Sequence, residues 1–173
     1  PAGIGAAVCA ARSGARTLVF DQNGCVGGQA TTGLVGPFMT CYDAQNKKMV
    51  IRGIFEEVVA RMKTLGGAVD PADVEAEEPF SGFYKIGHAH VGPFDHECFK
   101  LVCTQMLAES GAKLLLHTQF IDVLQENGRI TGVVAANKSG LFLFRAKVVI
   151  DCSGDADVAA RSGVKFELGR VED

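Results

Sequence analysis

The first 21 residues of the chain constrain its fold more than any other segment. They open with a run of small residues, Pro1-Ala2-Gly3-Ile4-Gly5-Ala6-Ala7, which leads into a helical pattern. The apolar residues of this pattern recur at the spacing of one helical face: Ile4, Ala7, Val8 and Ala11. Gly14 ends the helix, and Thr17–Phe20 reads as a short buried strand that ends at Asp21. A helix that leads through a glycine into a buried strand predicts an α/β fold with a parallel sheet.

The junction around Gly14 occurs twice more, at Gly111 and Gly163. The three copies are Arg12-Ser13-Gly14-Ala15-Arg16, Glu109-Ser110-Gly111-Ala112-Lys113 and Arg161-Ser162-Gly163-Val164-Lys165. Their spacing is not periodic, so they do not indicate a solenoid repeat. In each copy a helix ends, glycine adopts the left-handed conformation and a strand is expected to begin.

Two further helices are expected in the middle of the chain. The first spans about Met49 to Leu65, and the second begins after Asp95, whose side chain suits a helix N-cap. One face of the second helix is predicted to be buried: Phe99, Val102, Cys103, Met106 and Leu107. The segment Asp70–Gly92 contains prolines and glycines without a period, and it is predicted to be a loop or insertion.

The last third of the chain is rich in strand patterns. The expected strands are Lys113–His117, Phe120–Gln125, Ile130–Asn137 and Leu141–Val149. Turn residues at 126–129 and 137–140 separate three of them and predict a small β-meander. The apolar run Val148-Val149-Ile150 predicts a return to a buried parallel sheet, and a short helix is expected near Ala156–Ser162.

Composition places the chain of 173 residues among globular domains, because 47% of the residues are hydrophobic and 21% are charged. The net charge of −3, with no basic stripe, argues against a nucleic-acid partner. No apolar run has the length of a membrane span, so no membrane contact is expected. The six cysteines lack a C-x-x-C pair and lie mostly in apolar contexts, which predicts buried thiols in a reducing, cytoplasmic compartment.

The opening segment matches the second half of a dinucleotide-binding βαβ unit. Gly3 occupies the place of the last glycine of a G-x-G-x-x-G fingerprint, and Asp21 follows 18 residues later at the end of the next strand. An acid at about that spacing binds the ribose hydroxyls, while the helix N-terminus faces the pyrophosphate. Taken alone, this truncated fingerprint also fits a tight turn before an alanine-rich helix.

Three blocks together resemble the FAD-dependent oxidoreductases with a glutathione-reductase-type FAD domain. The first block runs from Pro1 to Asp21, and the second is Gly27-Gly28-Gln29-Ala30-Thr31-Thr32-Gly33-Leu34. The third is Val149-Ile150-Asp151-Cys152-Ser153-Gly154-Asp155-Ala156-Asp157, continuing to Arg170. Where such flavoproteins often have A-T-G, this chain has Cys152-Ser153-Gly154, and both replacements are small. The resemblance covers nearly the whole chain and is weakest around Asp70–Gly92.

The resemblance implies which residues hold the pyrophosphate and the ribose. Pro1, Ala2 and Gly3 would approach the pyrophosphate of FAD. Asp21 would hold the adenosine ribose, with Gln22 beside it. The competing interpretation of these positions is a glycine turn and ordinary core packing.

The resemblance also implies contacts along the rest of the cofactor. Gly28, Gln29 and Ala30 would line the path to the ribityl chain and the flavin. Phe120 corresponds to the position that contacts adenine through its backbone, although burial alone also accounts for a phenylalanine there. Gly154 would lie against the cofactor after the final strand. No catalytic residue is identified.

The expected architecture is a Rossmann-like FAD-binding domain whose first strand is missing. Residues 1–173 would form this partial domain, with a helical, substrate-side insertion at 38–112 and a β-meander at 113–147. The expected activity is two-electron redox of a small molecule with FAD as cofactor, by a piece that is incomplete at both ends. The alternatives are a non-catalytic FAD-binding protein and a truncated fragment. The partner would be the remainder of the parent chain or a second copy.

Two constellations suggest other chemistry. Cys98 and Cys103 have the spacing of a redox dithiol, but on a helix they lie on different faces. His88, His90 and His96 lie close together in the sequence, where they fit ordinary polar loop residues, substrate ligands or metal ligands. No metal is predicted, because no cysteine or carboxylate completes a familiar metal-binding spacing.

Overall fold

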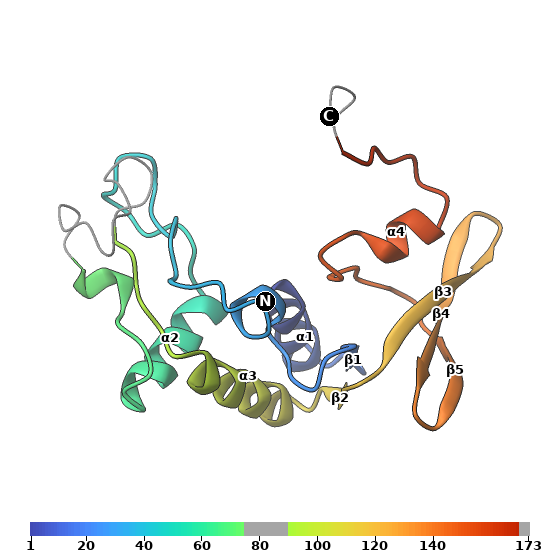
Figure 1. Ribbon diagram of the computed structural model, residues 1–173, viewed down its shortest axis with the longest axis horizontal. Coiled ribbons are helices and arrows are strands. Elements are labelled where there is room, and N and C mark those ends of the chain that lie inside the picture. Colours follow the sequence, from blue (N-terminus) through green and yellow to red (C-terminus); the bar gives the residue numbers. More distant parts are fainter. Residues whose placement is uncertain (75–89, 170–173) are drawn as a thin grey trace.

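The computed structural model describes residues 1–74 and 90–169 (Figure 1). In chain order, the elements are α1 (Ala2–Arg12), β1 (Leu18–Phe20), η1 (Gly28–Ala30), α2 (Ile54–Thr64), η2 (Pro71–Asp73), α3 (His96–Ser110), β2 (Lys113–Leu115), β3 (Gln119–Glu126), β4 (Arg129–Asn137), β5 (Gly140–Arg145) and α4 (Asp157–Arg161). Helices α1, α2 and α3 form one side of the molecule, and the strands β3–β5 with α4 form the other (Figure 1). The short β1–β2 pair lies between them, which confirms the mixed α/β fold.

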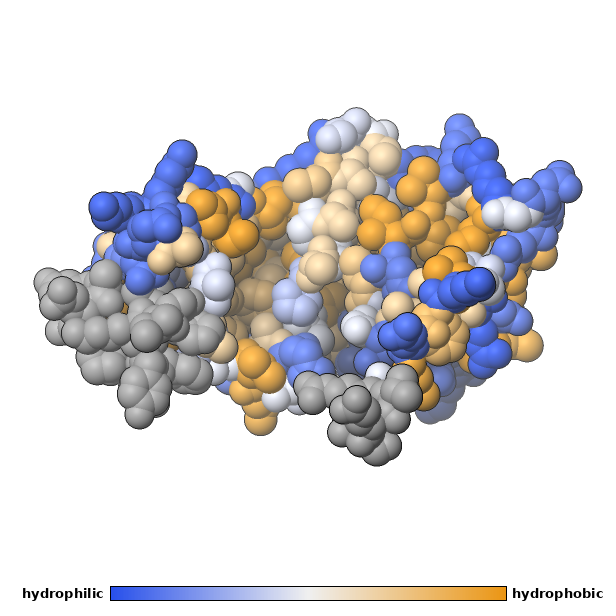
Figure 2. All heavy atoms as spheres, turned by 90° about the horizontal axis from the view of Figure 1, so that it is seen from above, coloured by the Kyte–Doolittle hydropathy of each residue, from blue (hydrophilic) through white to orange (hydrophobic). Residues whose placement is uncertain are grey.

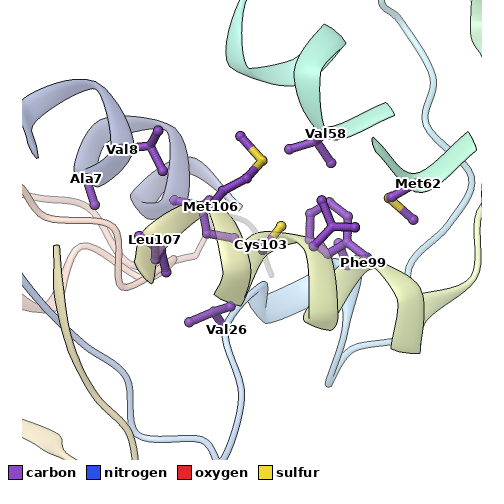
Figure 3. Close-up of a cluster of buried hydrophobic side chains, with 12 residues drawn as sticks. Ala7, Val8, Val26, Val58, Met62, Phe99, Cys103, Met106 and Leu107 are labelled. Carbon is purple, nitrogen blue, oxygen red and sulfur yellow. The ribbon is translucent and has the colours of Figure 1, made fainter. Parts of the chain in front are cut away.

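The hydrophobic core lies among the three longer helices. Side chains from α1, α2 and α3 point toward one another there, with Val26 from the loop after β1 added to the cluster (Figure 3). The members without any exposed surface are Val8, Met62, Val102, Cys103 and Met106. The predicted buried face of α3 is confirmed, because all five of its residues are buried. Burial of side chains of this size stabilises the fold by about 1.5–3 kcal/mol each before the entropy cost of ordering them.

Both ends of α3 form as the sequence predicts. The backbone N–H of Cys98 donates to Asp95 Oδ1 at 2.6 Å, which caps the N-terminus. Gly111 ends the helix with φ +82°, and Gly14 and Gly163 have similar values of +87° and +81°. Strands follow Gly14 and Gly111, but residues 164–169 after Gly163 form no strand.

Helix α2 begins five residues later than the sequence pattern predicts. The N–H groups of Val50 and Ile51 donate to the carbonyl of Cys41, at 2.8 and 3.1 Å. Residues 50–51 therefore bond to the loop at Cys41 and do not take part in the helix. Gly53, at φ +71°, then turns the chain into the helix. Ile51 is 50% exposed and Leu65 is 57% exposed, so neither end of the predicted segment is buried.

The strands form two separate sheets. β1 and β2 are parallel, with Val19 opposite Leu114, while β3, β4 and β5 form an antiparallel meander in chain order. The meander therefore begins at Gln119 rather than at residue 113, because β2 pairs with β1 instead. Asn127 and Gly128 both have positive φ, +52° and +74°, which is the two-residue hairpin geometry that the Asn-Gly sequence favours.

The predicted buried strand at 148–150 is absent. Residues 148–150 have no assigned strand, and Val148 and Ile150 are 75% and 60% exposed. A buried strand needs neighbours in its sheet, and no described strand pairs with this run. Leu18 of β1 is likewise 38% exposed, because β1 pairs only with β2 among the described residues. Figure 2 shows hydrophobic side chains exposed on the face seen from above.

The remaining predictions are met in part. All six cysteines are free thiols. Cys41 and Cys103 are buried, but Cys9 and Cys152 are exposed, contrary to the expected burial of most.

Asp70 caps η2 by accepting from the N–H of Ala72 at 2.9 Å. The loop predicted at 70–92 falls largely at 75–89, outside the described residues, as does His88. Among the described helices, none is long and apolar enough to cross a membrane.

Candidate functional site

The N-terminus of α1 is uncapped and lies close to two other segments. The N–H groups of Ala2 and Gly3 have no acceptor within residues 1–74 and 90–169, and no side chain caps the helix. A Cβ atom built on Gly3 would lie 3.3 Å from Cys152 Cβ, and one built on Gly28 would lie 3.8 Å from Pro1 Cδ. The sequence blocks at 1–7, 27–34 and 149–157 therefore meet here. Free N–H groups at a helix N-terminus bind anions such as phosphate.

The turn around Gly28 is held in one conformation by side chains within it. Thr31 is 1% exposed, and its hydroxyl donates to the carbonyls of Val26 and Gly28 at 2.9 and 3.2 Å. The hydroxyl of Thr32 donates to the Gly28 carbonyl at 3.0 Å. Val35 N–H closes the turn by donating to the Gln29 carbonyl at 2.8 Å. Such a preformed loop needs little ordering when a ligand binds.

One histidine joins this turn to the start of α3. His96 Nδ1 lies 2.8 Å from the carbonyl oxygen of Ala30, which accepts but cannot donate a hydrogen bond. Nδ1 therefore carries the proton of this bond. Ala30 is itself buried, whereas Gln29 beside it is exposed.

Asp21 lies at the carboxyl end of β1 with its backbone fully engaged. Its N–H donates to the Leu115 carbonyl at 3.0 Å, and its carbonyl accepts from Thr118 N–H at 2.9 Å. Oδ1 accepts from both the backbone and the side chain of Asn23, at 2.8 and 3.0 Å. Oδ2 accepts no hydrogen bond from any described residue, so it remains available for two ligand hydroxyls.

A polar hollow of about 530 Å³ opens beside Asp21, where β1 and β2 end. Its lining residues are Gln22, Asn23, His117, Gln119, Ala136 and Asn137. Phe120 follows Gln119 in β3 and pairs with Ala135 of β4. The amide-rich lining offers both donors and acceptors, which suits a nucleoside more than an apolar ligand.

The third block is organised by Asp151, a residue that the sequence interpretation overlooked. Asp151 Oδ1 accepts from the backbone and hydroxyl of Ser153, and Oδ2 accepts from the N–H groups of Val158 and Ala159 at 3.0 and 3.1 Å. Burial raises the pKa of Asp151, but these four hydrogen bonds outweigh burial, and the pKa lies below its ordinary value. A sequence signal for this role was present: Asp151 is followed two residues later by Ser153, just before a predicted helix, and such a pair favours a side-chain turn.

The predicted site residues fall into two groups. Pro1, Ala2, Gly3 and Gly28 lie together at the N-terminus of α1, with Gly154 two residues beyond Cys152. Gly154 itself is exposed, with φ +96° and no atom within 4 Å of the position of a Cβ. Gln29 and Ala30 belong to the same turn as Gly28.

The second group lies at the ends of the strands. Asp21 and Gln22 follow β1, and Phe120 lies in β3 next to a residue that lines the hollow. The two groups offer the surfaces that a dinucleotide needs: free N–H groups for a pyrophosphate, a carboxylate for a ribose and a polar hollow for a base. The described residues thus fit FAD.

The histidines differ in their surroundings. Both ring nitrogens of His90 face carbonyl oxygens, with Nδ1 2.7 Å from Val74 and Nε2 3.1 Å from Asn46. Its ring also stacks on Tyr42, with the centroids 3.8 Å apart. Within the described part of the chain, no group of histidine, cysteine and carboxylate side chains has the arrangement of a metal site.

The fold and this arrangement define a flavin-type dinucleotide-binding protein. The sequence model of one family, described as FAD dependent oxidoreductase, matches residues 1–173, and the chain belongs to that family. FAD is the cofactor of the family, as the resemblance implied. The glutathione-reductase-type subdivision stays a prediction. None of the curated proteins matches the sequence.

Several solved structures share the fold at low sequence identity. Thermovibrio ammonificans THI4 is 18% identical with a TM-score of 0.59, over 93% of this chain and 57% of that one. L-proline dehydrogenase from P. horikoshii is 16% identical with a TM-score of 0.57, over 96% and 54%. Glycerol-3-phosphate dehydrogenase from Bacillus halodurans, in complex with FAD, is 14% identical with a TM-score of 0.50, over 84% and 30%. The chain thus spans 57% or less of the length of each of these proteins.

Proposed function

We propose that this chain binds FAD and serves a two-electron oxidoreductase that acts on a small molecule. The observation that carries the proposal is the uncapped N-terminus of α1, next to which Gly28 and Cys152 lie. Free N–H groups at this point would hold the pyrophosphate. Membership of the FAD dependent oxidoreductase family supports the same function.

The remaining contacts would follow from the two groups of residues. Asp21 Oδ2 would accept from the ribose hydroxyls, and the hollow beside Gln22 would receive the adenine, near the backbone of Phe120. The turn Gly28–Ala30 would lie toward the flavin, and Gly154 follows Cys152, which packs against Gly3 at the helix N-terminus. When bound, FAD supplies two-electron chemistry at its isoalloxazine ring.

The second candidate is a piece that binds FAD without turning over a substrate. The exposed side chains of Leu18, Val148 and Ile150 favour this possibility, because they suit burial against a further strand. We propose that this strand comes from the remainder of a longer parent chain or from a second copy. A cytoplasmic location and the absence of nucleic-acid or membrane partners remain part of the proposal.

The experiment that tests the function is an FAD titration of the purified chain, followed by desalting and an absorption spectrum. We expect retained flavin bands in the natural sequence and a rise of about 10-fold in the Kd for FAD in Asp21→Asn, since a charged acceptor is lost. Asp122→Asn, on the exposed part of β3, is the matched control and should leave the Kd unchanged.

Anaerobic addition of candidate alcohols and amines then separates the two candidates. Bleaching of the flavin bands by a substrate supports the oxidoreductase. A flavin that is retained but never bleached, also in a chain extended at both ends, favours the non-catalytic alternative. Failure of the extended chain to retain flavin would refute FAD binding altogether.

A further inference from the structure

His96 combines two features, and no other described histidine has both. Its Nδ1 donates to the carbonyl of Ala30, in the turn that we place beside the flavin. Its Nε2 forms no hydrogen bond with the described residues. Because no buried side-chain nitrogen or oxygen among those residues lacks a partner, Nε2 must reach the surface.

The hydrogen bond to Ala30 determines whether Nε2 acts as a hydrogen-bond donor or as an acceptor. A neutral imidazole carries one proton, and here a carbonyl oxygen holds that proton on Nδ1. The open nitrogen Nε2 is then a hydrogen-bond acceptor with a fixed direction. Ring packing fixes this direction further, since Phe94 contacts the ring edge to face with the centroids 5.0 Å apart.

Because Gly36 has no side chain, the rings of His96 and Phe94 both pack on its backbone. A Cβ atom built on Gly36 would lie 3.4 Å from His96 Cε1, so the ring packs directly on the backbone there. His90 offers a contrast, because carbonyl oxygens face both of its nitrogens. His117 lines the polar hollow at the other end of the candidate site.

We propose that His96 is a cofactor-positioning residue with two separate functions. Through Nδ1 it fixes the turn Gly28–Ala30, and through Nε2 it accepts a hydrogen bond from a donor on the flavin half of FAD. The ribityl hydroxyls and the ring N–H of the flavin are the donors of that half. The inference rests on the proposed function, since it places the flavin beside this turn.

Three substitutions separate the two functions. In His96→Asn the side-chain amide reaches the position of Nδ1, so the bond to Ala30 is kept while the outer acceptor is lost. In His96→Gln the amide reaches the position of Nε2, so the acceptor is kept while the bond to Ala30 is lost. His96→Ala loses both, and His90→Gln is the matched control at a histidine away from this turn.

The readout is the Kd for FAD and, in parallel, the Kd for ADP, which carries the adenosine and pyrophosphate but no flavin. We expect His96→Ala to raise the Kd for FAD by about 10-fold or more, and each amide variant to raise it by roughly 3-fold. The Kd for ADP should rise less than the Kd for FAD in all three, because ADP lacks the flavin half, whereas Asp21→Asn should weaken both ligands alike.

Long-range proton–nitrogen NMR of the histidine rings gives a readout that is independent of ligand binding. We expect the His96 ring to carry its proton on Nδ1 in the free chain, with an Nε2 shift that changes when FAD is added. A ring protonated on Nε2, or an unchanged Kd for FAD in His96→Ala, would overturn the inference. A chain that binds neither FAD nor ADP would instead overturn the proposed function and leave the Nδ1 result standing.

Discussion

The helical side and the strand side of the molecule differ in how completely each buries its apolar side chains. On the helical side, Met62 and Met106 have no exposed surface, and α1, α2 and α3 enclose them (Figure 3). On the strand side, Leu141 is 73% exposed, and Val148 and Ile150 are largely exposed. The difference teaches that three helices brought together from distant parts of the chain can complete a core, whereas a sheet stays open until its neighbours are present.

Charged side chains reinforce the same contrast. Glu57 of α2 accepts from Arg12 of α1 at 2.6 and 2.9 Å and from Arg61 at 2.7 Å. Arg61 in turn pairs with Glu109 of α3 at 2.7 Å, so one network joins all three helices. The meander contains a single long ion pair among its described residues, between Arg145 and Glu126 at 3.5 Å.

The largest expected effect is on the helical core. Met106→Ala should lower the free energy of unfolding by about 3 kcal/mol, because it leaves a cavity where three helices meet. Urea titration followed by circular dichroism measures the change. Leu141→Ala on β5 is the control and should cost less than about 0.5 kcal/mol. Equal losses in the two variants would show that the helical side and the strand side are equally well packed, and would contradict the difference between them.

The second effect concerns the anchor of α4. Asp151→Asn should destabilise the 151–159 segment by about 1–2 kcal/mol, since a neutral amide replaces the carboxylate that accepts four hydrogen bonds. Amide hydrogen exchange at Val158 and Ala159 should accelerate accordingly. Asp155→Asn changes an exposed carboxylate in the same block and should leave both rates alone. Unaltered exchange rates in Asp151→Asn would show that Asp151 does not cap α4.

The third effect is a pH dependence within the helical network. Hydrogen bonds from Arg12 and then from Arg61 outweigh burial and lower the pKa of Glu57 from 4.5 to about 2. Because the folded pKa lies below the unfolded one, Glu57 contributes its stability above pH 4.5 and loses it as the pH falls toward 2. Since the side chain is 29% exposed, we expect about 1 kcal/mol rather than the full value of the shift.

Glu57→Gln should therefore be about 1 kcal/mol less stable than the natural chain near neutral pH, and the difference should shrink in acid. Thermal unfolding at a series of pH values measures this convergence. Glu97→Gln, in an exposed pair with Lys100, is the matched control, and its stability should follow the natural chain throughout. A constant gap down to the lowest pH would contradict the assigned pKa.

The smallest effect is expected where the chain was predicted to be buried. Ile150→Ser should change the free energy of unfolding by less than about 0.5 kcal/mol, because the side chain is 60% exposed. Val8→Ser in α1 supplies the buried comparison and should cost several times more. A large loss in Ile150→Ser would mean that residues 148–150 are packed in a sheet after all.

The sequence predicted the elements whose partners lie within the described chain. The helix after Asp95 formed with its cap, its buried face and its terminal Gly111, because these features depend on local chemistry and on one amphipathic stripe. The Asn127-Gly128 hairpin formed for a similar reason. The apolar run at 148–150 reads as a buried strand by composition alone, but burial depends on neighbouring strands that no local pattern supplies.

The candidate site was predicted unevenly. Gly3 was found through its spacing to Asp21 and Gly28 through the family resemblance, and the structure places their segments together at α1. Asp151 and His96 were overlooked or left ambiguous, because their roles depend on hydrogen bonds across the fold. The bond from His96 to Ala30 joins residues that are 66 positions apart, and no sequence period reports such a contact.

The pairing of the strands also has a consequence for the order of folding. β3, β4 and β5 are joined by tight turns, so their hairpins close over short loops and can form within microseconds. Leu18 of β1 pairs with Lys113 of β2, about 95 residues away, so this contact requires closure of a long loop. The meander should therefore form early, and the parallel pair should form only after α1 and α3 have docked. Since Asp21 and the polar hollow lie at the end of that pair, the ribose end of the site should be among the last parts of the molecule to assemble.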